Sequence, residues 1–183
     1  EGYTKAQSMD PYKSQRRGGR GKTAATTKQE DFVEKLFVAN SHETLLCFSN
    51  LGKVFWLKVY QLPQGSRTAR GKPLVNLLPL IDGEKITTVL PIKEFNKNNY
   101  VVMATSKGLI KKTELANFSR PRPSGIIAVG LGDDDHLIGA ILTSGENEIM
   151  LVSSQGKAVK FSERNVRSMG RSARGVRGIL LEG

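Results

Sequence analysis

The chain has 183 residues, enough for one domain or a compact pair, and it carries 28 Lys and Arg residues against 17 Asp and Glu. The net charge of +11 favours polyanionic partners or anionic surfaces. No apolar run approaches the ~18 residues of a spanning helix, and neither an amphipathic basic helix nor a signal peptide is evident. We therefore expect a cytoplasmic protein with no membrane partner.

In chain order, short apolar runs separated by turn residues predict β-strands rather than helices. We expect strands at residues 36–40, 44–49, 53–59, 74–78, 86–92, 100–105, 109–113, 126–131, 137–143, 148–153, 158–162 and 178–181. Only residues 23–36 keep a helical spacing, which suffices for a turn or two of helix. The chain is expected to be all-β, with roughly four strands in each repeated unit.

Three glycine-centred turns recur along the chain, in "SNLGKVF", "TSKGLIK" and "SSQGKAV". Their glycines are Gly52, Gly108 and Gly156, and each stands between two apolar or β-branched runs. A glycine between two such runs is typical of a tight β-hairpin. The sequence thus predicts three hairpins.

An arginine-rich turn follows each hairpin. We name them basic turns A (residues 65–73), B (119–125) and C (164–177). Their glycines, Gly71, Gly125 and Gly175, follow the hairpin glycines by 19, 17 and 19 residues, and successive hairpin glycines are 56 and 48 residues apart. A period near 50 residues with several strands per unit is typical of a radial β-repeat.

The N-terminal stretch "QRRGGRGKT" (residues 15–23) fits the same repeat. Gly2 precedes Gly21 by 19 residues, Gly21 precedes Gly71 by 50, and "EGYTKAQSMDPY" aligns with "LGKVFWLKVYQL". We therefore expect the stretch to be the basic turn of an earlier unit whose first half is missing. Residues 1–183 are expected to form an incomplete propeller-like domain of about three and a half units.

Two other interpretations of this stretch are weaker. A phosphate-binding loop that ends in Gly21-Lys22-Thr23 would need glycine at position 16, where Arg16 stands. A disordered RNA-binding tail would repeat the "RGG" motif many times in low-complexity sequence, whereas one copy is present here. We expect neither a nucleotide site nor such a tail.

Positive charge is concentrated in four segments nearly free of acids. Residues 15–28 and basic turns A, B and C hold 15 of the 28 cationic residues, and the acids cluster in other links. Because repeats place equivalent residues at equivalent positions, one rim should be positive, which suits the phosphates of a bent duplex. The alternative is a solvated loop in each unit that serves solubility alone, but solubility does not require this regular placement.

No catalytic or metal-binding set is recognisable. Cys47 lies in the apolar run "LLCFS" and is expected to be a buried thiol rather than a nucleophile. His42 and His136 are too few and too far apart in the sequence to suggest a metal site. Aromatic residues make up only 7%, which argues against a platform that stacks single-stranded bases.

Residues 15–21, "QRRGGRG", resemble the Q-[RK]-R-G-G-[RK]-G box found in the C-terminal domain of the DNA gyrase A subunit. The flanking segments "EDFVEKLFVANSHETLLCFSNLGKVFWLKVYQLP" and "EIMLVSSQGKAVKFSERNVRSMG" resemble the same family, so the similarity covers essentially the whole chain. The box is specific, because the related topoisomerase IV A subunit lacks an intact one. Arg20 stands where the family often has lysine.

The resemblance implies a β-pinwheel, a propeller-like disc whose neighbouring blades exchange strands. It implies a module that wraps double-stranded DNA on its basic perimeter and directs ATP-dependent negative supercoiling. Together with the charge pattern, it nominates these DNA-binding residues: Gln15, Arg16, Arg17, Gly18, Gly19, Arg20, Gly21, Lys22, Arg67, Arg70, Lys72, Arg120, Arg122, Arg171, Arg174 and Arg177. The family disc usually has six blades, so this chain alone would be incomplete.

The resemblance also sets expectations for partners and chemistry. The chain would not be an enzyme by itself, because the catalytic tyrosine and the ATPase, with its ATP and Mg²⁺, would lie in other parts of the holoenzyme. Expected partners are the gyrase B subunit together with the other parts of the A subunit, in an A2B2 assembly at the nucleoid. The alternatives are the C-terminal domain of the topoisomerase IV A subunit and a propeller-type protein-interaction scaffold.

Overall fold

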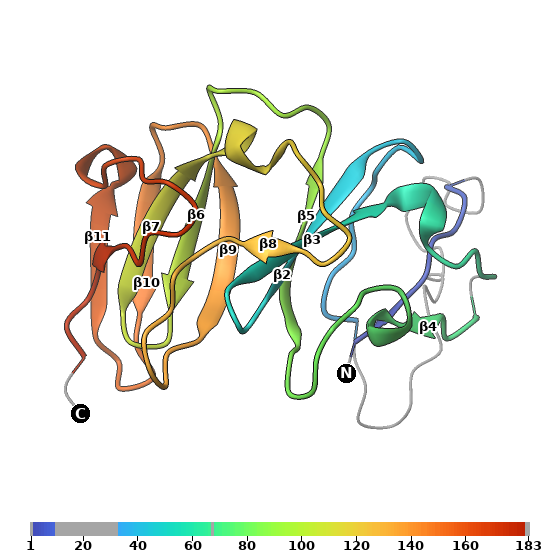
Figure 1. Ribbon diagram of the computed structural model, residues 1–183, viewed down its shortest axis with the longest axis horizontal. Helices are drawn as coiled ribbons and strands as arrows, with labels where there is room; N and C mark the ends of the chain where they lie inside the picture. Colours follow the sequence, from blue (N-terminus) through green and yellow to red (C-terminus); the bar gives the residue numbers. More distant parts are fainter. Residues whose placement is uncertain (1, 10–32, 67, 182–183) are drawn as a thin grey trace, which may run out of the picture.

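The computed structural model describes residues 2–9, 33–66 and 68–181, and within these ranges every regular element is a β-strand or a short 3-10 helix (Figure 1). The prediction of an all-β chain is confirmed. The helical turn expected at 23–36 lies mostly outside the described residues, and residues 33–36 form no helix.

Eight longer strands match the sequence prediction closely. They are β2 (Thr44–Ser49), β3 (Lys53–Lys58), β5 (Ile86–Ile92), β6 (Tyr100–Thr105), β7 (Leu109–Glu114), β9 (Leu137–Thr143), β10 (Glu148–Val152) and β11 (Ala158–Ser162). Four two-residue strands complete the set: β1 (Tyr3–Thr4), β4 (Lys72–Pro73), β8 (Ile126–Ile127) and β12 (Val176–Arg177). The 3-10 helices are η1 (Val59–Gln61), η2 (Leu74–Asn76), η3 (Leu115–Phe118) and η4 (Glu163–Asn165).

The strands form two four-stranded antiparallel sheets, ordered β5-β2-β3-β8 and β12-β7-β6-β9, and two two-stranded sheets, β10-β11 and β1-β4. The two larger sheets and the β10-β11 hairpin stand beside one another in chain order (Figure 1). At the hairpin turns Gly52, Gly108 and Gly156 have φ of 74°, 77° and 82°, a left-handed conformation that glycine adopts without steric cost. The three predicted hairpins are therefore confirmed.

Neighbouring units exchange strands, because each larger sheet combines a hairpin with two strands that come later in the chain. Strand β8 follows the β6-β7 hairpin in sequence but pairs with β3 of the earlier one, and β12 pairs with β7 in the same way. The register repeats: the residue after the hairpin glycine pairs with the second residue after the basic-turn glycine, as in Tyr3↔Pro73, Lys53↔Ile127 and Leu109↔Arg177. This repetition confirms the alignment of residues 2–4 with 52–54.

Two predicted strands were misplaced and one was too long. Strands expected at 74–78 and 178–181 are instead β4 and β12, which end before those ranges begin, and the strand expected at 126–131 ends with β8. In each case the last bond of the ladder runs from the N–H of the third residue after the basic-turn glycine to the carbonyl of the hairpin glycine. These bonds are Leu74 N to Gly2 O (2.9 Å), Ala128 N to Gly52 O (2.8 Å) and Gly178 N to Gly108 O (2.9 Å).

The strand expected at 36–40 is also wrong, since these residues form no ladder. In the next two units the corresponding strands, β5 and β9, pair with the first strand of a preceding hairpin, β2 or β6. Among the described residues, none pairs with 36–40. Leu36 and Val38 are accordingly exposed.

The core lies between the sheets rather than inside any one of them. Between the two larger sheets, Phe48 and Met103 are fully buried, and the Phe48 ring meets the Phe118 ring edge-on with centroids 5.9 Å apart. A second cluster on the other face of the first sheet includes Cys47 and Phe55. Strand β2 is buried along its whole length because both of its faces are covered, which explains its continuous apolar run.

Cys47 is expected to resist thiol reagents in the folded chain. Burial raises the pKa of the Cys47 thiol to about 12, so almost no thiolate is present near pH 8. An aromatic disulfide reagent should therefore release its chromophore only after guanidinium unfolds the chain, at one equivalent per chain. Immediate stoichiometric release from native protein would contradict this placement of Cys47.

Candidate nucleic-acid interface

Each basic turn is seated on the outer strand of the preceding unit through its glycine. Gly71, Gly125 and Gly175 have φ of 88°, 71° and 100°. A Cβ at Gly175 would lie 2.5 Å from Ile110 O, and one at Gly125 would lie 2.7 Å from the Phe55 ring, so a larger residue would push the turn outward. The three turns thus occupy equivalent places on successive units.

Basic turn A presents Arg70 and Lys72 to solvent. The Arg70 guanidinium carbon lies 4.3 Å from the centre of the Tyr3 ring, a cation–π distance, and Lys72 pairs with Thr4 in the β1-β4 ladder. Both cations are held at the edge of the smallest sheet. Arg67 lies outside the described residues.

Basic turn B presents Arg120 and Arg122, which are exposed and alternate with Pro121 and Pro123. The prolines fix the backbone φ of the turn and so restrict where the two guanidinium groups can go. The turn is attached to the first sheet where the Trp56 indole donates a hydrogen bond to the Phe118 carbonyl at 2.8 Å.

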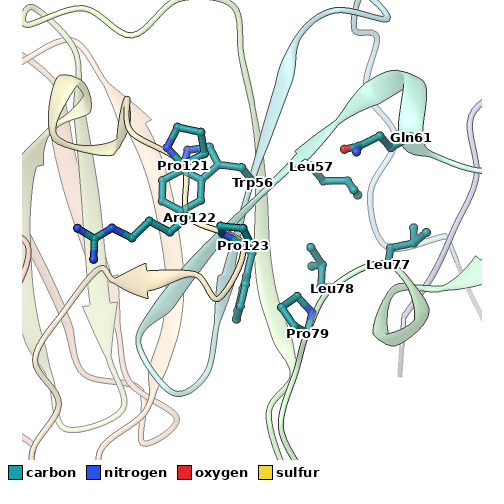
Figure 2. Close-up of a pocket in the computed structure, with 10 residues that line it drawn as sticks. Trp56, Leu57, Gln61, Leu77, Leu78, Pro79, Pro121, Arg122 and Pro123 are labelled. Carbon is teal, nitrogen blue, oxygen red and sulfur yellow. The ribbon is translucent and has the colours of Figure 1, made fainter.

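A hollow of about 430 Å³ opens beside basic turn B. It is lined by apolar side chains of β3, by residues 77–79 after η2, and by residues 121–123 (Figure 2). In this view Trp56 lies against Pro121 and Pro123, whereas the Arg122 side chain extends away from Leu78 and Pro79. Arg122, although it lines the hollow, is exposed.

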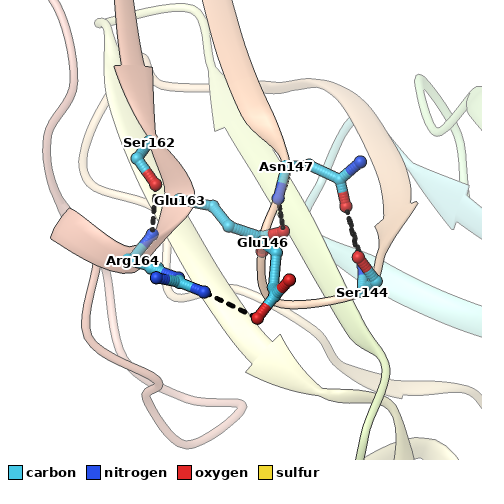
Figure 3. Close-up of polar contacts among 6 residues, drawn as sticks. All are labelled: Ser144, Glu146, Asn147, Ser162, Glu163 and Arg164. Carbon is cyan, nitrogen blue, oxygen red and sulfur yellow. Dashed lines mark hydrogen bonds and ion pairs between the residues drawn. The ribbon is translucent and has the colours of Figure 1, made fainter.

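The residue directly before basic turn C, Glu163, has a buried carboxylate. Glu163 is fully buried and accepts a hydrogen bond from the Asn147 backbone N–H at 2.7 Å (Figure 3). It accepts a second one from the Thr143 hydroxyl at 2.8 Å. Next to it, the exposed Arg164 pairs with the exposed Glu146 at 2.6 Å. The first arginine of turn C thus already has an acidic partner.

The three arginines of turn C that were predicted to bind DNA differ in exposure. Arg174 and Arg177 are exposed, and Arg177 belongs to β12, where it pairs with Leu109. Arg171 is half-buried. The described members of the predicted set therefore lie on all three basic turns, while residues 15–22 lie outside the described residues.

Two buried lysines escaped the sequence prediction. Lys111 and Lys112 lie on opposite faces of β7; the Lys111 ammonium donates to the Ala128 carbonyl at 2.6 Å and to the Arg171 carbonyl. Lys112 donates to the Glu163 carbonyl at 2.7 Å. Both side chains are buried and bond to backbone carbonyls instead of facing solvent. The only sequence signal for this burial was the pair "KK" inside an apolar run.

Two buried acids, Glu84 and Asp135, lie on the loops that lead into β5 and β9 and bond to residues of the hairpin turns. Buried Glu84 accepts a hydrogen bond from the Ser49 hydroxyl at 2.6 Å, and buried Asp135 accepts one from the Ser106 hydroxyl at 2.9 Å. Burial alone would raise the pKa of Asp135, but hydrogen bonds to its carboxylate, including one from Lys107 N–H, bring the pKa below its usual value. Acid and base are thus segregated between successive loops.

Within residues 2–9, 33–66 and 68–181, no cluster of His, Cys, Asp and Glu could hold a metal ion. Over the same described ranges, no helix is long and apolar enough to cross a membrane.

Strand exchange between repeated sheets, with a basic turn at the edge of each, defines a propeller-type repeat domain of the β-pinwheel class. A comparison with protein families matches residues 1–40, 43–93, 99–144 and 147–183 to the DNA gyrase C-terminal domain, beta-propeller. The chain belongs to that family.

Curated relatives include the DNA gyrase A subunit of Haemophilus influenzae, 59% identical over 181 residues, and that of Escherichia coli K12, 54% identical over 181 residues. Each of these alignments covers 99% of this chain and 21% of the relative, so the chain spans about a fifth of their length.

Solved structures show the same fold. The C-terminal domain of DNA topoisomerase IV superposes with a TM-score of 0.84 at 31% identity, covering 99% of this chain and 55% of that one. A DNA gyrase A C-terminal domain gives a TM-score of 0.66 at 24% identity, covering 96% of this chain and 56% of the other.

Proposed function

We propose that this domain binds and wraps double-stranded DNA as part of a gyrase A subunit, and that the wrap directs ATP-dependent negative supercoiling by the holoenzyme. The observation that carries the proposal is the equivalent placement of basic turns A, B and C on successive outer strands. Exposed Arg and Lys side chains on such a curved perimeter neutralise phosphates without reading bases. The curated relatives, which are named as the A subunit of DNA gyrase, support the assignment.

Gyrase is favoured over topoisomerase IV as the parent enzyme. The intact seven-residue box at 15–21 supports gyrase, and so do the names and the 54–59% identities of the curated relatives. We place the catalytic tyrosine, the ATPase and its Mg²⁺ outside this chain. We also place the chain in an A2B2 assembly with the gyrase B subunit, in the cytoplasm at the nucleoid.

Duplex binding should be electrostatic and nearly independent of sequence. Six described cations of the predicted set are exposed: Arg70, Lys72, Arg120, Arg122, Arg174 and Arg177. With ~6 phosphate contacts, the logarithm of the association constant should fall with the logarithm of salt concentration at a slope of about −5. Fluorescence anisotropy with labelled duplexes of unrelated sequence, titrated at several salt concentrations, measures this slope.

A pair of arginine variants tests whether the slope comes from the basic turns. Arg174→Gln should make the slope shallower by about 0.9, the value of one phosphate contact. Arg164→Gln removes the same charge from a side chain already paired with Glu146, so its effect on the slope should be smaller. A salt-independent affinity, or none for duplex DNA, would instead favour a protein-interaction scaffold.

A further inference from the structure

Basic turn C meets the segment after basic turn B in a closed junction. The Gly130 N–H donates to the Ala173 carbonyl at 3.0 Å, and a Cβ on Gly130 would lie only 2.5 Å from Ser172 O. In the previous unit the corresponding place, between residues 77–79 and 121–123, is the hollow beside basic turn B. One pair of successive turns is thus packed together, and the other is separated by open space.

Lys111 lies at the centre of the closed junction. It is the third residue after its hairpin glycine, the position that Phe55 holds in the unit with the hollow. Its ammonium bonds at once to the Ala128 carbonyl, which follows basic turn B, and to the Arg171 carbonyl of basic turn C. One buried side chain therefore joins the segments of two successive basic turns.

Lys111 stays charged at neutral pH despite its burial. Burial, with the nearby Arg171 guanidinium as the second cause, lowers the pKa of Lys111 to about 8. At pH 7 the ammonium is therefore mostly protonated and has three donors for the carbonyls around it. Its side chain is only 1% exposed, so it has no access to DNA.

We propose that Lys111 is a positioning residue for DNA binding: by joining the Ala128 and Arg171 carbonyls, it fixes basic turn C against the segment that follows basic turn B. This inference rests on the proposed function and refines it. Arg171, Arg174 and Arg177 can contact the phosphates next to those reached by turn B only if the two turns keep a constant separation. A supporting residue that fixes this separation reduces the ordering cost of binding.

Two substitutions disturb the junction from opposite sides. Lys111→Met removes the buried ammonium but keeps a long side chain, and Gly130→Ala introduces the contact with Ser172 without changing any charge. Each should lower duplex affinity at least about tenfold and make the salt slope shallower by about 2, because the turn C arginines would no longer bind together. A loss of stability alone would lower the melting temperature and leave the slope of the folded chain unchanged.

Two matched controls accompany them. Lys85→Met removes one charge from an exposed lysine on an acidic loop, and Gly170→Ala adds a Cβ that meets nothing within 4 Å. Both should keep the wild-type slope to within about one unit. Circular dichroism melts establish that each variant is folded at the temperature of the binding assay.

The outcomes separate this inference from the proposed function. If the affinity of the wild-type chain for duplex DNA does not depend on salt concentration, the proposed DNA wrapping is refuted, whatever the role of Lys111. If the wild-type chain shows a steep salt slope and the folded Lys111→Met and Gly130→Ala variants both keep it, the positioning role of Lys111 is overturned and the proposed function stands. If neither variant folds, hydrogen exchange of the wild-type chain decides: a slowly exchanging Gly130 amide supports the closed junction, and a freely exchanging one overturns it.

Discussion

Neutralising Arg16, Arg17 and Arg20 together in the full-length subunit is expected to abolish ATP-dependent negative supercoiling. Three arginines and three glycines in seven residues suit a loop whose backbone approaches phosphates closely, because glycine lacks the Cβ that would block the approach. Each arginine supplies paired donors to phosphate oxygens. Cleavage and ATP-independent relaxation should survive, since we propose that the groups responsible lie outside this chain. Plasmid topology gels with and without ATP measure both activities.

Lys22 provides the matched control. It directly follows the box, and the phosphate-loop interpretation would make it the essential residue. Lys22→Gln should leave most of the supercoiling activity and all of the ATP turnover. The wrapping account fails if Lys22→Gln abolishes ATP turnover while the triple arginine variant still supercoils DNA.

Glu163→Ala is expected to cause the largest loss of stability, about 3 to 5 kcal/mol. The change leaves the Asn147 N–H and the Thr143 hydroxyl without the acceptor that they share, and each unsatisfied buried donor costs about 1–3 kcal/mol. The truncated side chain also leaves a cavity beside β9 and β10. Urea denaturation followed by circular dichroism, extrapolated linearly to water, gives the free energy of unfolding.

Two neighbouring substitutions show whether burial causes that loss. Glu163→Gln keeps one oxygen for the Asn147 N–H and an amide that can donate to Thr143, so it should cost less than half as much. Glu146→Gln breaks only an exposed ion pair with Arg164 and should cost less than about 1 kcal/mol. If Glu163→Ala is no more destabilising than Glu146→Gln, the buried carboxylate is not an anchor of turn C.

The long strands could be predicted because their signals are local. An apolar run determines where a hairpin begins, and the glycine after it, Gly52 or Gly108, determines where the hairpin turns. The structure has strands at these runs and left-handed φ angles at these glycines. The short strands β4 and β12 could not be placed within their runs. Each is defined by its pairing with a strand from a distant part of the chain, β1 for β4 and β7 for β12.

The candidate interface shows the same division. Composition and spacing indicated which segments would be basic, and Arg120, Arg122, Arg174 and Arg177 are indeed exposed on their turns. The buried lysines of β7 carry the same charge as these arginines, and nothing in their local sequence determines whether a partner carbonyl will be within reach. That depends on which segment packs over the strand.

By itself, the sequence determined the all-β repeat, the positions of the hairpins and the positive charge of the turns that follow them. These properties arise from side-chain alternation, from glycine's access to left-handed φ and from net charge, all of which act over a few residues. Only the tertiary structure decided that each basic turn pairs with the preceding unit, that Lys111 closes one junction and that a hollow separates the other. Those outcomes depend on hydrogen bonds and close contacts between segments some 60 to 70 residues apart, such as Leu109↔Arg177 and Lys111 with Arg171.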